Sequence, residues 1–216
     1  RNGCNAIIET PTNMLLAGLD NTVIPADVTS IGPYAFYCCS FTTLDIPKGV
    51  TSIGEGAFGA CTRLTSLIIP EGVTNIETLT FGDCSSLTSI TIPDGVTSIG
   101  EHAFSRSGLT SINIPSGVRS IGFDAFGQCK NLASVTISEN DTIIGDYAFR
   151  NCTSLTSVVI PAAVKSIGED AFGGCSLLEH VDIMSTTPPS IGIYAFGYDD
   201  VYPIYVPAGS VDTYKS

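Results

Sequence analysis

Hydrophobic positions recur along this 216-residue chain with a period of 22 or 23 residues. Each repeat has an isoleucine usually followed by proline, a second isoleucine about seven residues later, and then a phenylalanine. The first isoleucines are Ile24, Ile46, Ile69, Ile92, Ile114, Ile137, Ile160 and Ile183, and the phenylalanines are Phe36, Phe58, Phe81, Phe104, Phe126, Phe149, Phe172 and Phe196. A unit this short cannot bury its own apolar side chains, so we expect stacked units that share one continuous core.

Two extended segments and one tight turn are predicted in every repeat. The stretch L-x-x-I-x-I alternates with period 2 at its end, which predicts a strand with half of its side chains inside. The following proline lacks an N–H group and should end that strand. The T-S-I-G stretch predicts a second short extended piece. The segment around the phenylalanine is too short for a full helix and predicts a single turn of α- or 3₁₀-helix.

Composition excludes several classes of protein. Charged residues make up only 14% of the chain, hydrophobic residues make up 44%, and the formal net charge is −12. Disordered chains have low hydrophobicity and many charges, which this chain does not. A membrane span would need about 18 uninterrupted apolar residues, and the sequence has no such run. Nucleic acid is not expected as a partner, because an acidic chain without a basic stripe repels phosphates.

The repeated unit L-x-x-I-x-I-P-x-G-V-x-S-I-G-x-x-A-F-x-x-C resembles the BspA-type leucine-rich repeat over about residues 24–206. This resemblance implies a right-handed, curved, β-rich leucine-rich-repeat solenoid, with one short parallel strand per repeat, a second extended segment and single-turn helices on the convex side. It suggests a hairpin-like cap at residues 1–23, eight repeats at 24–205 and a closing rung at 206–216.

The same resemblance also implies a setting for the chain. It suggests the extracellular repeat region of a larger bacterial protein, secreted or on the cell surface, present as a monomer and adhering to a host or extracellular-matrix protein. Fold alone does not determine function. A structural spacer that displays another domain is therefore the alternative reading.

The cysteines follow the repeat rather than a disulfide framework. Cys61, Cys84, Cys129, Cys152 and Cys175 lie three residues after a repeat phenylalanine, and Cys38 or Cys39 fills this slot in the first repeat. We expect buried free thiols that act as small hydrophobic side chains. Disulfides between rungs are the alternative, although parallel Cβ vectors do not suit them. Cys4 and the Cys38–Cys39 pair are the places for unusual redox chemistry.

No catalytic, cofactor or metal site is predicted. His102 is expected in a solvated turn, whereas His180 should point outward beside Asp182, a pair that can orient an imidazole for base catalysis. No motif places a serine or cysteine near that pair, so a surface pair is the favoured reading. Acidic residues precede most of the Ala-Phe pairs, and we interpret them as a solubilising edge rather than a weak calcium site or a surface for a cationic partner. These residues are Glu55, Glu101, Asp124, Asp146, Glu169 and Asp170.

The outward positions of the L-x-x-I-x-I strands are the candidate binding surface. They are Ser66, Ile68, Ser89, Thr91, Ser111, Asn113, Ser134, Thr136, Ser157, Val159, His180 and Asp182. Small hydroxyl side chains dominate, and the aromatic and arginine anchors that usually carry binding energy are few. The alternative reading is that serine and threonine are simply tolerated at strand positions.

The sixth repeat breaks the pattern. It reads Ile137-Ser-Glu-Asn-Asp-Thr instead of I-P-x-G-V-x, so the inward valine is replaced by Asp141. A carboxylate at a buried position is costly unless the turn is rebuilt. We therefore expect a local bulge that carries Glu139, Asn140 and Asp141 outward, either as a site or as sequence drift.

Overall fold

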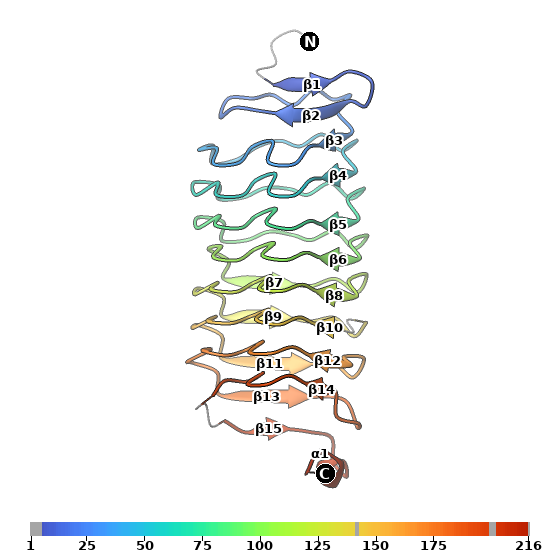
Figure 1. Cartoon of the computed structure of the whole chain (residues 1–216), viewed down its shortest axis with the longest axis vertical. Coiled ribbons are helices and arrows are strands. Elements are labelled where there is room, and N and C mark those ends of the chain that lie inside the picture. Colours follow the sequence, from blue (N-terminus) through green and yellow to red (C-terminus); the bar gives the residue numbers. More distant parts are fainter. Residues whose placement is uncertain (1–5, 141–142, 199–201, 216) are drawn as a thin grey trace.

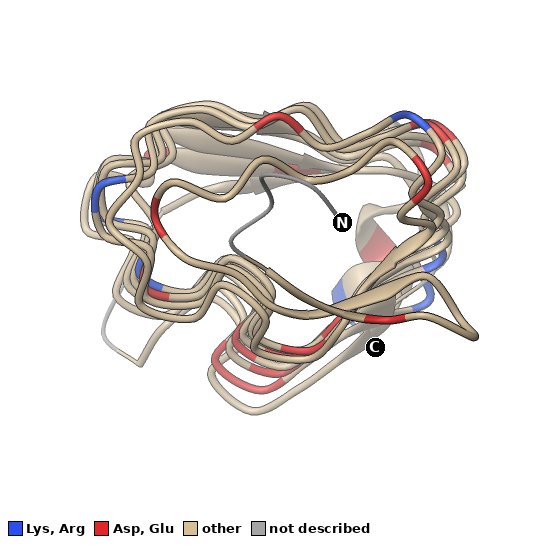
Figure 2. Ribbon diagram, turned by 90° about the horizontal axis from the view of Figure 1, so that it is seen from above, with Lys and Arg blue, Asp and Glu red and all other residues tan. Residues whose placement is uncertain are grey.

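A computed structural model describes residues 6–140, 143–198 and 202–215. The chain winds into coils that stack along one long axis, with the N-terminus at one end and the C-terminus at the other (Figure 1). Seen along the axis, the coils lie almost directly above one another (Figure 2). The predicted solenoid of parallel strands is confirmed.

The second isoleucine of each repeat forms one side of the coil. Short two-residue strands there pair in parallel and in register, so that Ile99 of one coil lies beside Ile121 of the next. These strands are β3 (Ser30–Ile31), β4 (Ser52–Ile53), β5 (Asn75–Ile76), β6 (Ser98–Ile99), β8 (Ser120–Ile121), β10 (Ile143–Ile144), β12 (Ser166–Ile167) and β14 (Ser190–Ile191). The ladder continues from β5 to β14, and a separate sheet holds β3 and β4.

The L-x-x-I-x-I segment forms another side of the coil. In the later repeats it gives the strands β7 (Ser111–Asn113), β9 (Ser134–Thr136), β11 (Ser157–Ile160), β13 (His180–Ile183) and β15 (Ile204–Tyr205). Burial alternates as predicted: Val158 and Ile160 of β11 are buried and Val159 is exposed. The ladder stops between β9 and β11. Among the described residues of the earlier repeats, a single bridge between Ile68 and Thr91 replaces the ladder.

Stacked phenylalanines fill the core. The rings of Phe104 and Phe126 lie 5.1 Å apart between centroids and 5° from parallel, and the same arrangement runs from Phe36 to Phe172. Each of these rings is fully buried. Burial of one such side chain contributes roughly 1.5–3 kcal/mol, so a column shared by all coils is a large part of the stability.

The predicted single-turn helices are wrong. The segments around the phenylalanines are successive β-turns, closed in the first repeat by hydrogen bonds from Ala35 N to Gly32 O and from Cys39 N to Phe36 O. A residue with positive φ lies in each turn, such as Tyr34 at 55° and Cys38 at 61°. Left-handed residues at this frequency cannot continue a right-handed helix, although they suit the third position of type II turns. The turns are held to the next coil instead, for example by Phe36 N donating to Ala57 O at 2.8 Å.

The glycine after the second isoleucine is required by space rather than by φ. A Cβ atom on Gly54 would lie 2.6 Å from the backbone nitrogen of Pro33, and one on Gly100 would lie 2.7 Å from that of Thr78. Neither glycine has a positive φ. A side chain on Gly54 or Gly100 would therefore push the neighbouring coil away, although the third repeat carries Glu77 at the equivalent position.

The two ends of the stack differ. At the N-terminal end, β1 (Ile7–Glu9) and β2 (Met14–Ala17) form an antiparallel hairpin, and β2 pairs in parallel with β3. At the C-terminal end lies α1 (Val211–Lys215), the only helix among the described residues. None of the described helical structure is long and apolar enough to cross a membrane.

Hydrogen bonds connect the irregular sixth repeat to the fifth. Ser138 Oγ donates to Pro115 O at 3.2 Å, and Asn140 Nδ2 donates to Ser116 O at 3.3 Å. Glu139 and Asn140 are exposed, in line with the expected outward turn, and Asp141 lies outside the described residues. The serine that replaces the repeat proline thus supplies a hydrogen bond to the neighbouring coil.

Candidate functional site

The outward side chains of the L-x-x-I-x-I segments form one continuous surface, which we call the hydroxyl face. All twelve predicted positions, from Ser66 to Asp182, are exposed or half-exposed. Parallel register aligns them in columns, so that Ser157 lies beside His180 and Val159 beside Asp182. Strand alternation positions these side chains as predicted, and their role in binding remains a prediction.

Two grooves lie on the hydroxyl face, both where the strand ladder is interrupted. The N-terminal groove has a volume of about 530 Å³ and includes Asp45, Lys48, Ile68 and Thr91 among its lining residues. The C-terminal groove has a volume of about 580 Å³. It is lined by Val135, Thr136, Ile137, Glu139, Val159, Pro161, Ala162, Ala163 and Met184. Both volumes fall within the range of ordinary ligand pockets, and neither groove was predicted from the sequence.

The His180–Asp182 pair lies at the C-terminal end of this face. The two side chains point to the same side of β13, as predicted, with 3.6 Å between Nε2 of His180 and Oδ2 of Asp182. The imidazole also meets the ring of Tyr205 edge to face, with 5.9 Å between the centroids. Both side chains are about one-third exposed, so the pair is accessible to solvent and is a contact on the protein surface.

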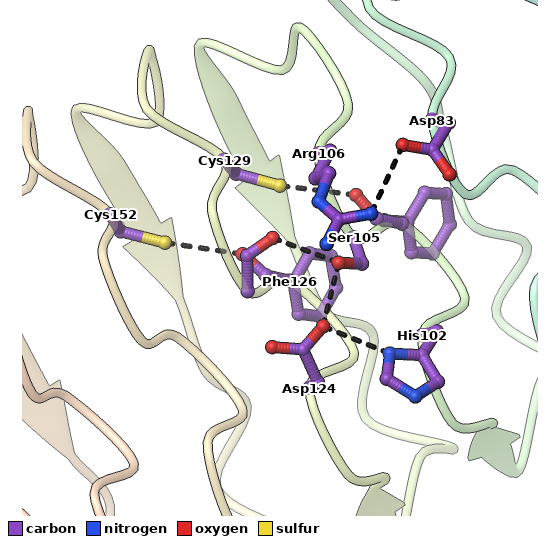
Figure 3. A network of polar contacts seen from close by, with 10 residues as sticks. Asp83, His102, Ser105, Arg106, Asp124, Phe126, Cys129 and Cys152 are labelled. Carbon is purple, nitrogen blue, oxygen red and sulfur yellow. Dashed lines mark hydrogen bonds and ion pairs between the residues drawn. The ribbon is translucent and has the colours of Figure 1, made fainter. Parts of the chain in front are cut away.

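A second histidine is more tightly held than the sequence suggests. Oδ2 of Asp124 accepts a hydrogen bond from Ser105 Oγ at 2.6 Å and also lies 2.9 Å from His102 Nδ1 (Figure 3). Ser105 is buried, and its Oγ also donates a hydrogen bond to Gly127 O at 3.2 Å. The prediction of a solvated turn for His102 is therefore only partly right: its side chain is half-exposed but pinned to the next coil.

The three residue types of this network are those of a hydrolase triad, but the order is different. In a triad the imidazole lies between the carboxylate and the serine, so that it can take the hydroxyl proton. Here Asp124 lies between His102 and Ser105. The arrangement joins adjacent coils, and the imidazole of His102 does not lie beside the Ser105 hydroxyl as it would in a triad.

The acidic edge is largely paired with neighbouring coils. Tyr34 and Tyr147 donate to the carboxylates of Glu55 and Glu169, which raises the pKa of both phenols. Asp170 forms an ion pair with Arg150 at 2.8 Å. Acidic residues of several coils lie at one corner of the ribbon in Figure 2. Within the described residues, no group of three or more His, Cys, Asp or Glu side chains is arranged to hold a metal ion.

The cysteine column is a ladder of buried thiols. The five predicted cysteines are buried and form no disulfide, and each thiol donates to the carbonyl of the phenylalanine one coil earlier, as Cys129 does to Phe104 at 3.1 Å. Burial raises the pKa of Cys129 to about 11 and that of Cys61 to about 12. Such thiols are poor nucleophiles, and the expected column of buried thiols is confirmed by their burial. Cys38 is exposed and Cys39 is half-buried, and Cys4 lies outside the described residues.

Solved structures of bacterial repeat proteins are similar to this chain. A leucine-rich repeat protein from Bacteroides ovatus is 28% identical, with a TM-score of 0.70 over 85% of this chain and 63% of its own. A leucine-rich cell surface protein from Faecalibacterium prausnitzii is 30% identical, with a TM-score of 0.55 over 74% of this chain and 52% of its own. A leucine-rich repeat protein from T. pallidum is 24% identical, with a TM-score of 0.61 over 90% of this chain and 87% of its own, and supports the fold alone.

This chain therefore spans less than two thirds of the length of the first two relatives. A search of curated proteins finds no match. The family model of the BspA-type leucine-rich repeat region matches residues 15–132 and 97–214, with six copies of the repeat. That family is associated with bacterial surface proteins and is generally non-catalytic. With most of its length matched by that model, the chain belongs to the BspA-type leucine-rich repeat family.

Proposed function

We propose that this chain is a non-catalytic protein-binding module of a bacterial surface, and that the hydroxyl face contacts the partner. The observation that carries the proposal is the face itself: aligned columns of exposed short side chains interrupted by two grooves. Short side chains leave the backbone accessible and lose little conformational entropy on binding. An extracellular host or matrix protein is the partner class that we infer.

The reactive groups elsewhere on the molecule support a non-catalytic role. The Asp124 network has the wrong order for serine activation, and the cysteine ladder is buried with raised pKa values. The His180–Asp182 pair lies on the hydroxyl face and is available to a partner as a polar contact. A structural spacer would need the coils but not the grooves, so it is the alternative that an experiment must exclude.

Capture by immobilised extracellular-matrix and serum proteins tests the proposal. The wild-type chain is compared with a variant that carries Thr91→Arg and Thr136→Arg, one change in each groove. The control carries Thr51→Arg and Thr97→Arg, which make the same charge change at exposed positions beside β4 and β6. Urea unfolding of all three proteins checks that the fold is retained.

The proposal predicts saturable capture that the groove variant loses and the control variant keeps. A partner retained equally by all three proteins would place binding elsewhere and contradict the proposal for the hydroxyl face. If the wild-type chain captures no protein of the panel, the result favours the hypothesis that the chain is a structural spacer.

A further inference from the structure

The C-terminal groove opens toward the core, as the N-terminal groove does at Leu44 and Ile90. Val135 occupies an inward position of β9 yet is half-buried, whereas the equivalent Ile112 and Val158 are 4% and 1% exposed. Val135 and Ile137 line the groove. The opening coincides with the place where the ladder stops between β9 and β11.

The groove is apolar in its walls and acidic at one point. Val159 and Met184 are 49% and 54% exposed, and Pro161, Ala162 and Ala163 complete an aliphatic wall. Glu139 is the one ionisable side chain among the described lining residues, and it is exposed. Asp182 lies beside Val159 in the register of β11 and β13 and adds a second carboxylate next to the groove.

We propose that this groove binds an extended segment of a partner protein, with one aliphatic side chain between Val159 and Met184 and a lysine or arginine beside Glu139. The inference rests on the proposed function and names the chemistry of its partner at one place. Aliphatic walls favour an aliphatic side chain, because burial of one contributes roughly 1.5–3 kcal/mol. Charge complementarity selects a basic neighbour, since the chain carries a net charge of −12 and the described lining residues include no base.

The neighbouring groove provides a contrast on the same face. The N-terminal groove contains both Asp45 and Lys48, so its charges offset each other, and its exposed aliphatic side chain is Ile68. A substitution there changes the same surface without touching the proposed site. Ile68→Thr is therefore the matched control for Val159→Thr, and threonine already occupies this column at Thr91 and Thr136.

Methionine methyl resonances report the binding directly. The chain has two methionines: Met184 lines the groove, and Met14 lies in β2 at the opposite end of the stack. We would label the methionine methyl groups of the whole chain with ¹³C and titrate it with synthetic nonapeptide pools. One pool has a fixed Lys-x-Φ-x-Lys core, where Φ is Leu, Ile, Val or Met; in the others serine replaces Φ, or glutamate replaces both lysines.

The basic aliphatic pool should shift the Met184 resonance saturably and leave the Met14 resonance unchanged. The serine pool should bind at least tenfold more weakly, and the glutamate pool should be weaker by a factor that shrinks as salt is added. Val159→Thr should weaken binding about fivefold or more, whereas Ile68→Thr should not. Glu139→Lys should reverse the preference between the lysine and glutamate pools.

The proposal is overturned if Met184 does not respond to any pool at millimolar concentration, or if all three pools act alike. It is also overturned if Ile68→Thr weakens binding as much as Val159→Thr. Failure here is distinguishable from failure of the proposed function. Capture of an extracellular protein that Thr91→Arg and Thr136→Arg abolish would leave the binding module standing and remove only this partner chemistry.

Discussion

The thiol of Cys129 donates a hydrogen bond to the carbonyl oxygen of Phe104, one coil earlier, across 3.1 Å. The same contact recurs at Cys61, Cys84, Cys152 and Cys175. Ser107 occupies the slot in the fourth repeat, where its hydroxyl lies 3.3 Å from Cys129 Sγ. Each of the five cysteines thus supplies a small donor to a carbonyl of the preceding coil, and this contact leads to the first prediction.

Removing the donor should cost more than exchanging it. Cys129→Ala leaves the Phe104 carbonyl without this partner and opens a small cavity, which together should lower the free energy of unfolding by about 1–3 kcal/mol. Cys129→Ser keeps a donor at the same place and should cost less. Urea unfolding followed by circular dichroism measures both, and equal losses for the two variants would contradict the role of the hydrogen bond.

Stability should fall in alkaline solution because buried thiols resist ionisation. Burial raises the pKa of Cys129 to about 11 and that of Cys61 to about 12, whereas an unfolded cysteine ionises near about 8.5. The unfolded chain thus releases protons first, so this stability is fully present below about pH 8.5 and is lost as the pH rises toward the folded pKa.

The expected slope is up to about 1.4 kcal/mol per pH unit for each such thiol. Unfolding free energies measured at several values between about pH 8 and pH 10.5 test this, with Cys129→Ser as the reference that lacks one thiol. The wild-type chain should lose stability more steeply than the variant. Parallel curves for the two proteins would show that this thiol does not titrate as its burial requires.

Close approach of the coils should make any substitution of Gly100 lower the stability of the fold. A Cβ atom there would lie 2.7 Å from the backbone nitrogen of Thr78, whereas one on Gly95 would meet nothing nearer than 3.5 Å. Gly100→Ala should therefore lower stability by about 1–3 kcal/mol through overpacking, and Gly95→Ala should change it little. Thermal unfolding of the two single variants provides the comparison, and similar midpoints would argue against the spacing constraint.

Asp124 should contribute to stability both as a hydrogen-bond acceptor and as a residue that adopts the left-handed backbone conformation. Its carboxylate contacts Ser105 and His102, and its φ is +50°. Asp124→Asn keeps an acceptor and a side chain that tolerates this backbone conformation, so it should cost little. Asp124→Ala loses both and should cost about 2–4 kcal/mol in total. Equal stability of the alanine and asparagine variants, measured in urea, would show that the network contributes nothing.

Much of this fold could be predicted because one spacing fixes many contacts at once. The recurrence of Phe104 and Phe126 after 22 residues places equivalent atoms in adjacent coils, and the rings indeed stack. Strand alternation likewise predicted which side chains point outward. Such predictions depend on residue type and period, which the sequence states directly.

The turns could not be predicted by the same reasoning. Left-handed φ values occur at Leu79, Arg106 and Gln128, residue types that avoid this conformation when isolated. Stacking of coil on coil imposes it, at a local cost of about 1–2 kcal/mol per residue. The Asp124 network and the C-terminal groove were missed because each joins side chains of adjacent repeats, and spacing along one repeat does not show them.

Site-specific photo-crosslinking tests whether the hydroxyl face binds protein. A benzophenone side chain is introduced in place of Ser111, exposed on β7, or in place of Thr97, exposed beside β6. Each variant is irradiated with the extracellular protein panel. We expect covalent capture of a partner through position 111 and little through position 97. Crosslinking that is stronger at position 97, or absent at both, would contradict it.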